Sequence, residues 1–162
     1  MRVLVSDTSV LIDLERGDLI ERAFGLTFEL AVPDVLYRRE LQDFDGQRLV
    51  ALGLRVEELE AEGVADAQAF RRCAPRLSVP DSLALALAQR RTWTLLTGDG
   101  ALRQLALAEE VACHGVLWLL DLMLEEGVAG DQLRDGLAAI AAHPRCRLPV
   151  RDVRLRLDRY GG

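Results

Sequence analysis

The chain has 162 residues, a formal net charge of −6 and 50% hydrophobic residues, a composition that is typical of one folded domain and excludes a disordered chain. No apolar run approaches the roughly 20 residues of a membrane-spanning helix. All 20 basic residues are arginine, which excludes chemistry that requires lysine, such as P-loop nucleotide binding or Schiff-base catalysis.

The three cysteines are odd in number and widely spaced, at Cys73, Cys113 and Cys146. This pattern argues against both a disulfide framework and a zinc site. We therefore expect reduced thiols and a cytoplasmic protein.

Short apolar runs alternate along the chain with helical patterns. Residues 2–6 (RVLVS) form a continuous apolar run, which is typical of a strand buried on both faces. Further strands are predicted at residues 28–33, 54–59, 92–97 and 111–113. Helices are predicted at residues 8–17, 18–24 with Asp18 as N-cap, 34–44 with Gly46 as a break after it, 62–73, 79–91, 98–110, 115–127 and 130–143. The tail from residue 146 is predicted as either a last helix or an extended arm.

Strands that alternate with helices predict an α/β fold with a parallel sheet covered on both faces. No repeat, low-complexity linker or domain boundary is evident. We expect a single domain over residues 1–162, with a core at about 1–115 and C-terminal helices at about 115–160.

Acidic residues lie at the ends of several predicted elements. Asp7 follows the first strand, Asp81 opens the helix before the fourth strand, and Asp99 follows the fourth strand; Glu40 lies in the helix after the second strand. We call these four residues the acidic quartet. Sites in open parallel sheets form outside the carboxyl ends of strands, so Asp7 and Asp99 converge if strands one and four are neighbours. Clustered carboxylates repel each other, and a divalent cation such as Mg²⁺ or Mn²⁺ removes that penalty.

Each acid also has a simpler interpretation. Asp7 and Asp81 are plausible helix caps, Glu40 a solvated helix residue, and Asp99 a turn residue. Asp13 is interpreted only as helix surface or a cap. The joint pattern of the quartet favours a shared site over four independent caps.

The sequence resembles the PIN-domain nucleases, a family that includes VapC-like toxin ribonucleases. The resemblance is carried by VSDTSVLIDL, the acid within VLYRREL, VPDSLALALA and LLTGDGALRQLA. It implies a three-layer α/β/α sandwich whose five-stranded parallel sheet has the order 3-2-1-4-5. In that order strands one and four are adjacent, as the site argument requires.

The resemblance also implies a metal-dependent ribonuclease. The quartet would be both catalytic and metal-binding, with one or two Mg²⁺ or Mn²⁺ ions as cofactor, and cleavage would leave 5′-phosphate and 3′-hydroxyl ends. Auxiliary hydroxyls match at Thr8, Ser9 and Thr97. Candidate substrate-binding residues for RNA phosphates are Arg38, Arg39 and Arg103, with the tail arginines Arg151, Arg154, Arg156 and Arg159 as further candidates.

Partners and alternatives follow from the same resemblance. A toxin would have a small antitoxin protein as partner, and the apolar helices around residues 115–142 offer a surface for a homodimer. One alternative is a catalytically inactive PIN-like module that binds RNA or protein, and another is a housekeeping RNA-processing nuclease. Receiver domains and haloacid-dehalogenase-like phosphatases are disfavoured because both need a lysine.

Overall fold

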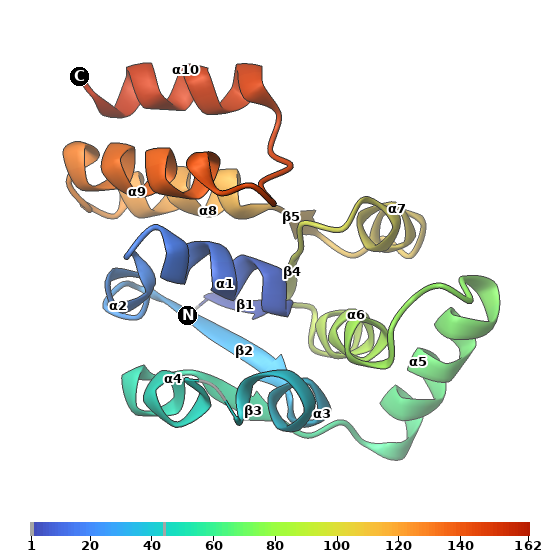
Figure 1. Cartoon of the computed structure of the whole chain (residues 1–162). Coiled ribbons are helices and arrows are strands. Elements are labelled where there is room, and N and C mark those ends of the chain that lie inside the picture. The colour runs from blue at the N-terminus through green and yellow to red at the C-terminus, as the bar shows by residue number, and fades with distance from the viewer. Residues whose placement is uncertain (1, 44) are drawn as a thin grey trace.

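The computed structural model describes residues 2–43 and 45–162. Five strands form one parallel sheet with the order β3-β2-β1-β4-β5, which confirms the predicted topology (Figure 1). The strands are β1 (Arg2–Ser6), β2 (Phe28–Pro33), β3 (Arg55–Glu57), β4 (Thr94–Leu96) and β5 (Cys113–His114). The strand order reverses between β1 and β4, so a switch point lies where the acids were expected to converge.

Helices form a layer on each face of the sheet (Figure 1). They are α1 (Thr8–Arg16), α2 (Ile20–Ala23), α3 (Asp34–Leu36) continuing into a π-helical turn η1 (Tyr37–Leu41), α4 (Gly46–Leu52), α5 (Ala61–Cys73), α6 (Val79–Arg91), α7 (Gly100–Ala108), α8 (Val116–Glu125), α9 (Gly130–Ala142) and α10 (Val150–Tyr160). Helices α5, α6 and α7 cover one face, and α1, α8 and α9 cover the other, with α10 packed outside α9. Within residues 2–43 and 45–162, no helix is both long and apolar enough to cross a membrane.

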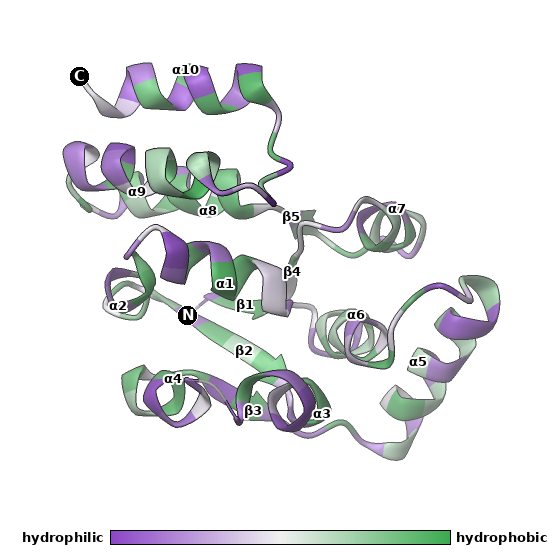
Figure 2. Cartoon of the chain, in the orientation of Figure 1, coloured by the Kyte–Doolittle hydropathy of each residue, from purple (hydrophilic) through white to green (hydrophobic). Residues whose placement is uncertain are grey.

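Two hydrophobic cores lie on opposite faces of the sheet because successive side chains of a strand point to opposite sides. Leu4 and Leu96 belong to the core under α1, α8 and α9, whereas Val5 and Leu95 belong to the core under α5, α6 and α7. All four side chains are fully buried. Figure 2 shows the hydrophobic strands at the centre and the mixed colouring of the outer helices α5 and α10.

Helix α6 shows why the fourth strand is shorter than predicted. Ser78 caps the helix by accepting a hydrogen bond from the Asp81 amide at 3.1 Å, and Pro80 lies in the first turn. Every residue of the run 82–88 is buried. The helix ends at Thr92, whose backbone is left-handed with φ of 55°. This turn delays pairing with β1 until Thr94.

Two local predictions are wrong. Gly46 does not break a helix; it begins α4, and a Cβ there would lie 2.7 Å from the Leu41 carbonyl oxygen, so the position needs glycine for close packing. Asp18 is not an N-cap, because it occupies a left-handed turn with φ of 53° and Leu19 precedes α2 instead. Phe44, where the third predicted helix was to end, lies outside the described residues.

The tail is a helix rather than an extended arm. Helix α10 is fastened to α8 through Asp121, which accepts hydrogen bonds from the Arg156 guanidinium at 2.8 Å and from the Tyr160 hydroxyl at 2.5 Å. Arg159 adds an ion pair with Asp121 at 3.7 Å. Fastening α10 in this way also determines where the connection between α9 and α10 runs.

Candidate functional site

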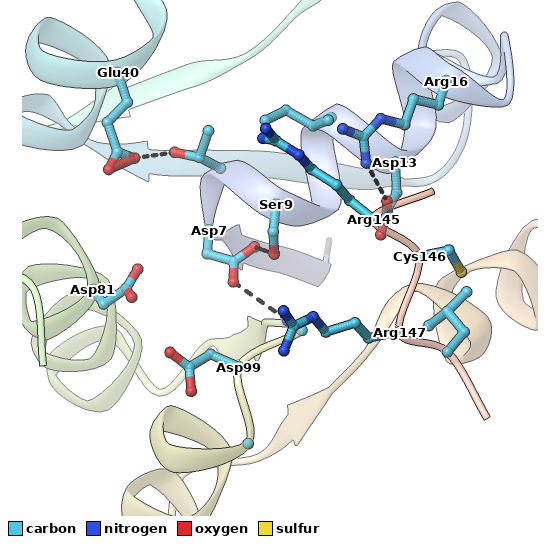
Figure 3. A pocket seen from close by; sticks show the side chains of 15 residues that line it. Asp7, Ser9, Asp13, Arg16, Glu40, Asp81, Asp99, Arg145, Cys146 and Arg147 are labelled. Carbon is cyan, nitrogen blue, oxygen red and sulfur yellow. Dashed lines mark hydrogen bonds and ion pairs between the residues drawn. The ribbon is translucent and has the colours of Figure 1, made fainter. Parts of the chain in front are cut away.

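A cavity of about 720 Å³ lies at the carboxyl ends of β1 and β4, and all four members of the acidic quartet line it (Figure 3). Asp7 comes directly after β1 and Asp99 shortly after β4; Glu40 comes from η1 and Asp81 from the first turn of α6. The amide of Asp7 donates to the Leu96 carbonyl at 3.0 Å, which extends the pairing of β1 and β4 to the edge of the cavity. The predicted convergence of Asp7 and Asp99 is therefore present.

Asp7 is both a helix cap and a member of the site. Its side chain is only 3% exposed. One carboxylate oxygen accepts from the Ser9 hydroxyl at 2.8 Å and the Val10 amide at 2.9 Å; the other accepts from the Thr97 hydroxyl at 2.5 Å and the Gly98 amide at 3.3 Å. Four donors compensate this carboxylate for the water lost on burial.

Thr97 links two members of the quartet. Its buried hydroxyl donates to Asp7 and accepts from the Asp99 amide at 3.0 Å. One Asp99 oxygen caps α7 by accepting from the Ala101 amide at 2.8 Å, and the side chain is exposed. A capping role and a place in the cavity therefore coexist for Asp99, as they do for Asp7.

Glu40 reaches the cavity from the π-helical turn η1, a type of irregularity that is frequent at functional sites. The Thr8 hydroxyl donates to one of its carboxylate oxygens. Thr8 and Glu40 also line a second, more apolar cavity of about 610 Å³ between α1 and α4. Thr8, Ser9, Ile12 and Glu40 line both cavities and thus separate them.

Asp81 carries the clearest electrostatic sign of clustering. Burial raises the pKa of its carboxyl to about 6, and the negative charges of Asp7, Glu40 and Asp99 add to the increase. A hydrogen bond with Ser78 opposes it. The other three carboxylates of the quartet therefore lie close enough to disfavour the ionised form of Asp81.

A fifth acid in the cavity was missed by sequence reasoning. Asp13 lines the cavity with Arg16 on the same helix, and the two form an ion pair at 3.9 Å. Burial raises the Asp13 pKa to about 6; the Arg16 charge lowers it and the Asp7 charge raises it. A signal was available, because Ser9, Asp13 and Arg16 are spaced to share one helical face.

The connection between α9 and α10 completes the cavity. Arg145, Cys146, Arg147 and Leu148 line it beside the quartet (Figure 3). We call residues 143–149 the linker. No local pattern indicated its role, since its position depends on how α10 packs.

The arginines predicted to bind substrate lie elsewhere. Arg38 pairs with Asp34 at 3.4 Å on the surface, Arg39 lines the second cavity, and Arg103 donates to the Thr97 carbonyl at 3.1 Å. None of the three lines the carboxylate cavity. A substrate role for them remains a prediction.

The donor chemistry of the cavity suits a hard divalent cation, with one geometric restriction. Among the described residues, no three His, Cys, Asp or Glu side chains are grouped so that they could hold one ion together. Mg²⁺ commonly binds through one or two carboxylates, with water and substrate phosphates completing its shell. The quartet fits that mode, whereas an ion enclosed by protein ligands alone does not fit.

Comparison with known proteins agrees with the fold. A PIN domain family model matches residues 3–161. A solved PilT N-terminus domain protein from the hyperthermophilic archaeon Sulfolobus solfataricus P2 is similar in fold, with a TM-score of 0.53 and 14% identity over 79% of this chain and 98% of that chain. A search of curated proteins found no match. Because the family model spans nearly the whole sequence, the chain belongs to the PIN domain family, whose fold is that of nucleases.

Proposed function

We propose that this protein is a metal-dependent ribonuclease that hydrolyses phosphodiester bonds with Asp7, Glu40, Asp81 and Asp99. The observation that carries the proposal is the shared cavity, in which the carboxylates of Asp7, Glu40 and Asp99 raise the pKa of Asp81 in addition to the effect of burial. Four carboxylates that only capped helices would not have to line the same cavity. Perturbed carboxylates that converge in a cleft are typical of a site built for chemistry.

The quartet would hold Mg²⁺ or Mn²⁺. When bound, such an ion neutralises clustered charge, lowers the pKa of water and stabilises negative charge on phosphoryl oxygens. The chain's own residues supply rigidity: four hydrogen bonds hold Asp7, Thr97 couples Asp7 to Asp99, and Thr8 orients Glu40. No histidine lines the cavity, so the described residues favour carboxylate chemistry there over a pair of histidines.

The test is cleavage of RNA by the purified chain with Mn²⁺, compared with Asp99→Asn and Asp81→Asn. Asp158→Asn is a matched control, because Asp158 is exposed on α10 and outside the cavity. We expect the two quartet variants to lose on the order of 100-fold or more in rate, as removal of a group that stabilises developing charge does. Equal cleavage by wild type and Asp99→Asn, or no cleavage by wild type with any divalent cation, would contradict the proposal.

One observation favours a second candidate, a catalytically inactive module that binds RNA or protein. The described side chains include no group of three metal-binding residues close enough to share an ion. If this candidate is correct, the wild type never cuts RNA with Mn²⁺ present, whether or not it binds it. The cleavage assay therefore separates the two candidates.

The biological role is proposed separately from the activity. As a toxin, the protein would act with a small antitoxin protein and as a homodimer; as a housekeeping nuclease, it would process RNA without arresting growth. Induced expression of wild type and Asp99→Asn separates these roles. Growth arrest by the wild type alone supports the toxin role, and unchanged growth despite measured cleavage supports the housekeeping role.

A further inference from the structure

Two arginines of the linker face the carboxylates across the cavity. Figure 3 shows the Arg145 and Arg147 side chains extending from the linker into the cavity, where Asp7 and Asp99 also point. In the part of the chain that the structure describes, neither arginine has a carboxylate within ion-pair distance. The tail arginines Arg156 and Arg159 are different, because both form ion pairs with Asp121.

The linker is an ordered segment rather than a loose arm. The Arg145 amide donates to His143 Nδ1 at 3.1 Å, and the Cys146 amide donates to the His143 carbonyl at 2.9 Å. Leu148 packs against the core beneath α1 and α8. The two guanidinium groups are therefore presented from a backbone that is anchored on both sides, which lowers the entropy lost when they bind a ligand.

The cavity consequently has two walls of opposite charge. Arg16 also lines it, and Asp13 compensates its charge. Among the described residues that line this cavity, Arg145 and Arg147 are the arginines without an ion pair to an acid. A guanidinium fork matches the oxygens of a phosphate group, whereas the carboxylate wall repels phosphate unless a cation intervenes.

We propose that Arg145 and Arg147 bind phosphates of a single-stranded nucleic acid that enters the carboxylate cavity. This inference rests on the proposed function, which sets the orientation of the bound strand. The bond to be cut lies at the quartet, and the linker on the opposite wall holds the phosphates that flank this bond. We specify a single strand because the linker and the quartet line the same cavity of about 720 Å³, and a convex duplex surface does not enter such a cavity. The arrangement also explains how a chain with a net charge of −6 attracts a polyanion locally.

The experiment measures binding in the absence of any divalent cation. Fluorescence anisotropy with a labelled single-stranded RNA is recorded over a salt series in a chelator, for wild type and for Arg145→Gln combined with Arg147→Gln. Arg22→Gln combined with Arg72→Gln is the matched control, because both residues are exposed and line neither cavity. A single-stranded DNA and an RNA duplex of equal length are further probes, and urea unfolding checks that each variant folds.

We expect the linker variant to bind RNA about tenfold or more weakly at low salt. The slope of log affinity against log salt should fall by about 0.7 for each phosphate that loses its arginine, hence by about 1.4 if the two contact separate phosphates. Single-stranded DNA should show the same loss, because phosphates are common to both. The control variant should bind single-stranded RNA as the wild type does. The wild type and the linker variant should bind the RNA duplex equally.

An unchanged slope in the linker variant overturns the inference, as does an equal loss in the control or the absence of wild-type binding to single strands. The outcome is separable from that of the proposed function. If the wild type binds through these arginines and cuts nothing with any metal, ribonuclease activity is refuted and the inference stands. If the wild type cuts RNA and the linker variant binds with an unchanged slope, the inference alone is refuted.

Discussion

Replacing Asp7 with asparagine should destabilise the fold strongly, although the side chain keeps its shape. The carboxylate is 3% exposed and accepts four hydrogen bonds. The asparagine amide places an NH₂ group where one of the two carboxylate oxygens was. The two donors that bound that oxygen then face a third donor, the NH₂ group. The hydroxyl in each pair can rotate away, but the backbone amide of Val10 or Gly98 cannot.

The magnitude follows from these contacts. An unpaired amide in this setting costs about 1–3 kcal/mol, and each hydrogen bond to a charged group contributes about 1.5–3 kcal/mol. Relief of the repulsion between Asp7 and Asp81 offsets part of the loss, so we expect a net decrease of about 3 kcal/mol in the free energy of unfolding. Asp99→Asn is the matched comparison: Asp99 is exposed, and asparagine is as good an N-cap as aspartate, so it should cost less than about 1 kcal/mol.

Urea unfolding of the chelated proteins near neutral pH measures the difference. With a slope of about 1–3 kcal/mol per molar urea, a loss of about 3 kcal/mol lowers the midpoint by about 1–3 M. Equal midpoints for Asp7→Asn and Asp99→Asn would refute the account of Asp7 as a buried carboxylate held by four donors. If the account is correct, Asp99→Asn is the cleaner variant for cleavage assays, because its loss of activity cannot be ascribed to unfolding.

Three further changes test the packing and the electrostatics. Asp121→Asn removes the charge that binds the guanidinium of Arg156. It should lower the free energy of unfolding, measured by urea titration, by about 2 kcal/mol, since hydrogen bonds to charged groups contribute that much. No measurable change would mean that α10 is held by apolar contacts alone. Gly136→Ala should lower the thermal midpoint, at a cost of about 1–3 kcal/mol, because its methyl group would lie 2.8 Å from a backbone oxygen of the helix α1 terminus. Gly100→Ala should leave the thermal midpoint unchanged, because no atom lies within 4 Å of the added methyl group. Similar midpoints for the two variants would contradict the close approach of α9 to the end of α1. Burial and then neighbouring carboxylates raise the pKa of Asp81 from 3.8 to about 6. The native state therefore binds this proton more tightly than the unfolded state does. The resulting stability is present below pH 3.8 and is lost as the pH rises through about 6. Relative to wild type, Asp81→Asn should therefore be more stable near neutral pH than near pH 4, by about 1 kcal/mol after allowance for solvent screening, and a pH-independent difference would contradict the raised pKa.

Much of the fold could be predicted because its signals are local. The continuous apolar run of β1 identifies a strand buried on both faces, and Val5 and Leu4 do enter separate cores. The start of α6 is encoded by Ser78 and Pro80 within one turn. Strand ends were less predictable, since β4 begins only after the left-handed turn at Thr92.

The site could be predicted only in part. Asp7 and Asp99 follow strands that the strand order makes neighbours, so their meeting follows from topology. Glu40 reaches the cavity through a π-helical turn, which the sequence of its segment does not indicate. For Asp13 the sequence indicates only helix surface or a cap, because its burial depends on what packs over α1.

By itself, the sequence determined the alternation of strands and helices, the double burial of the sheet and the four acids at element ends, because periodicity and capping involve residues only a few positions apart. The tertiary structure alone decided that the linker arginines face those acids. Gly17 and Gly136 allow α9 to approach α1 closely, and Asp121 fastens α10. Such contacts join residues that are 35 or more positions apart, and they fix the linker through shape and charge that no short stretch of sequence contains.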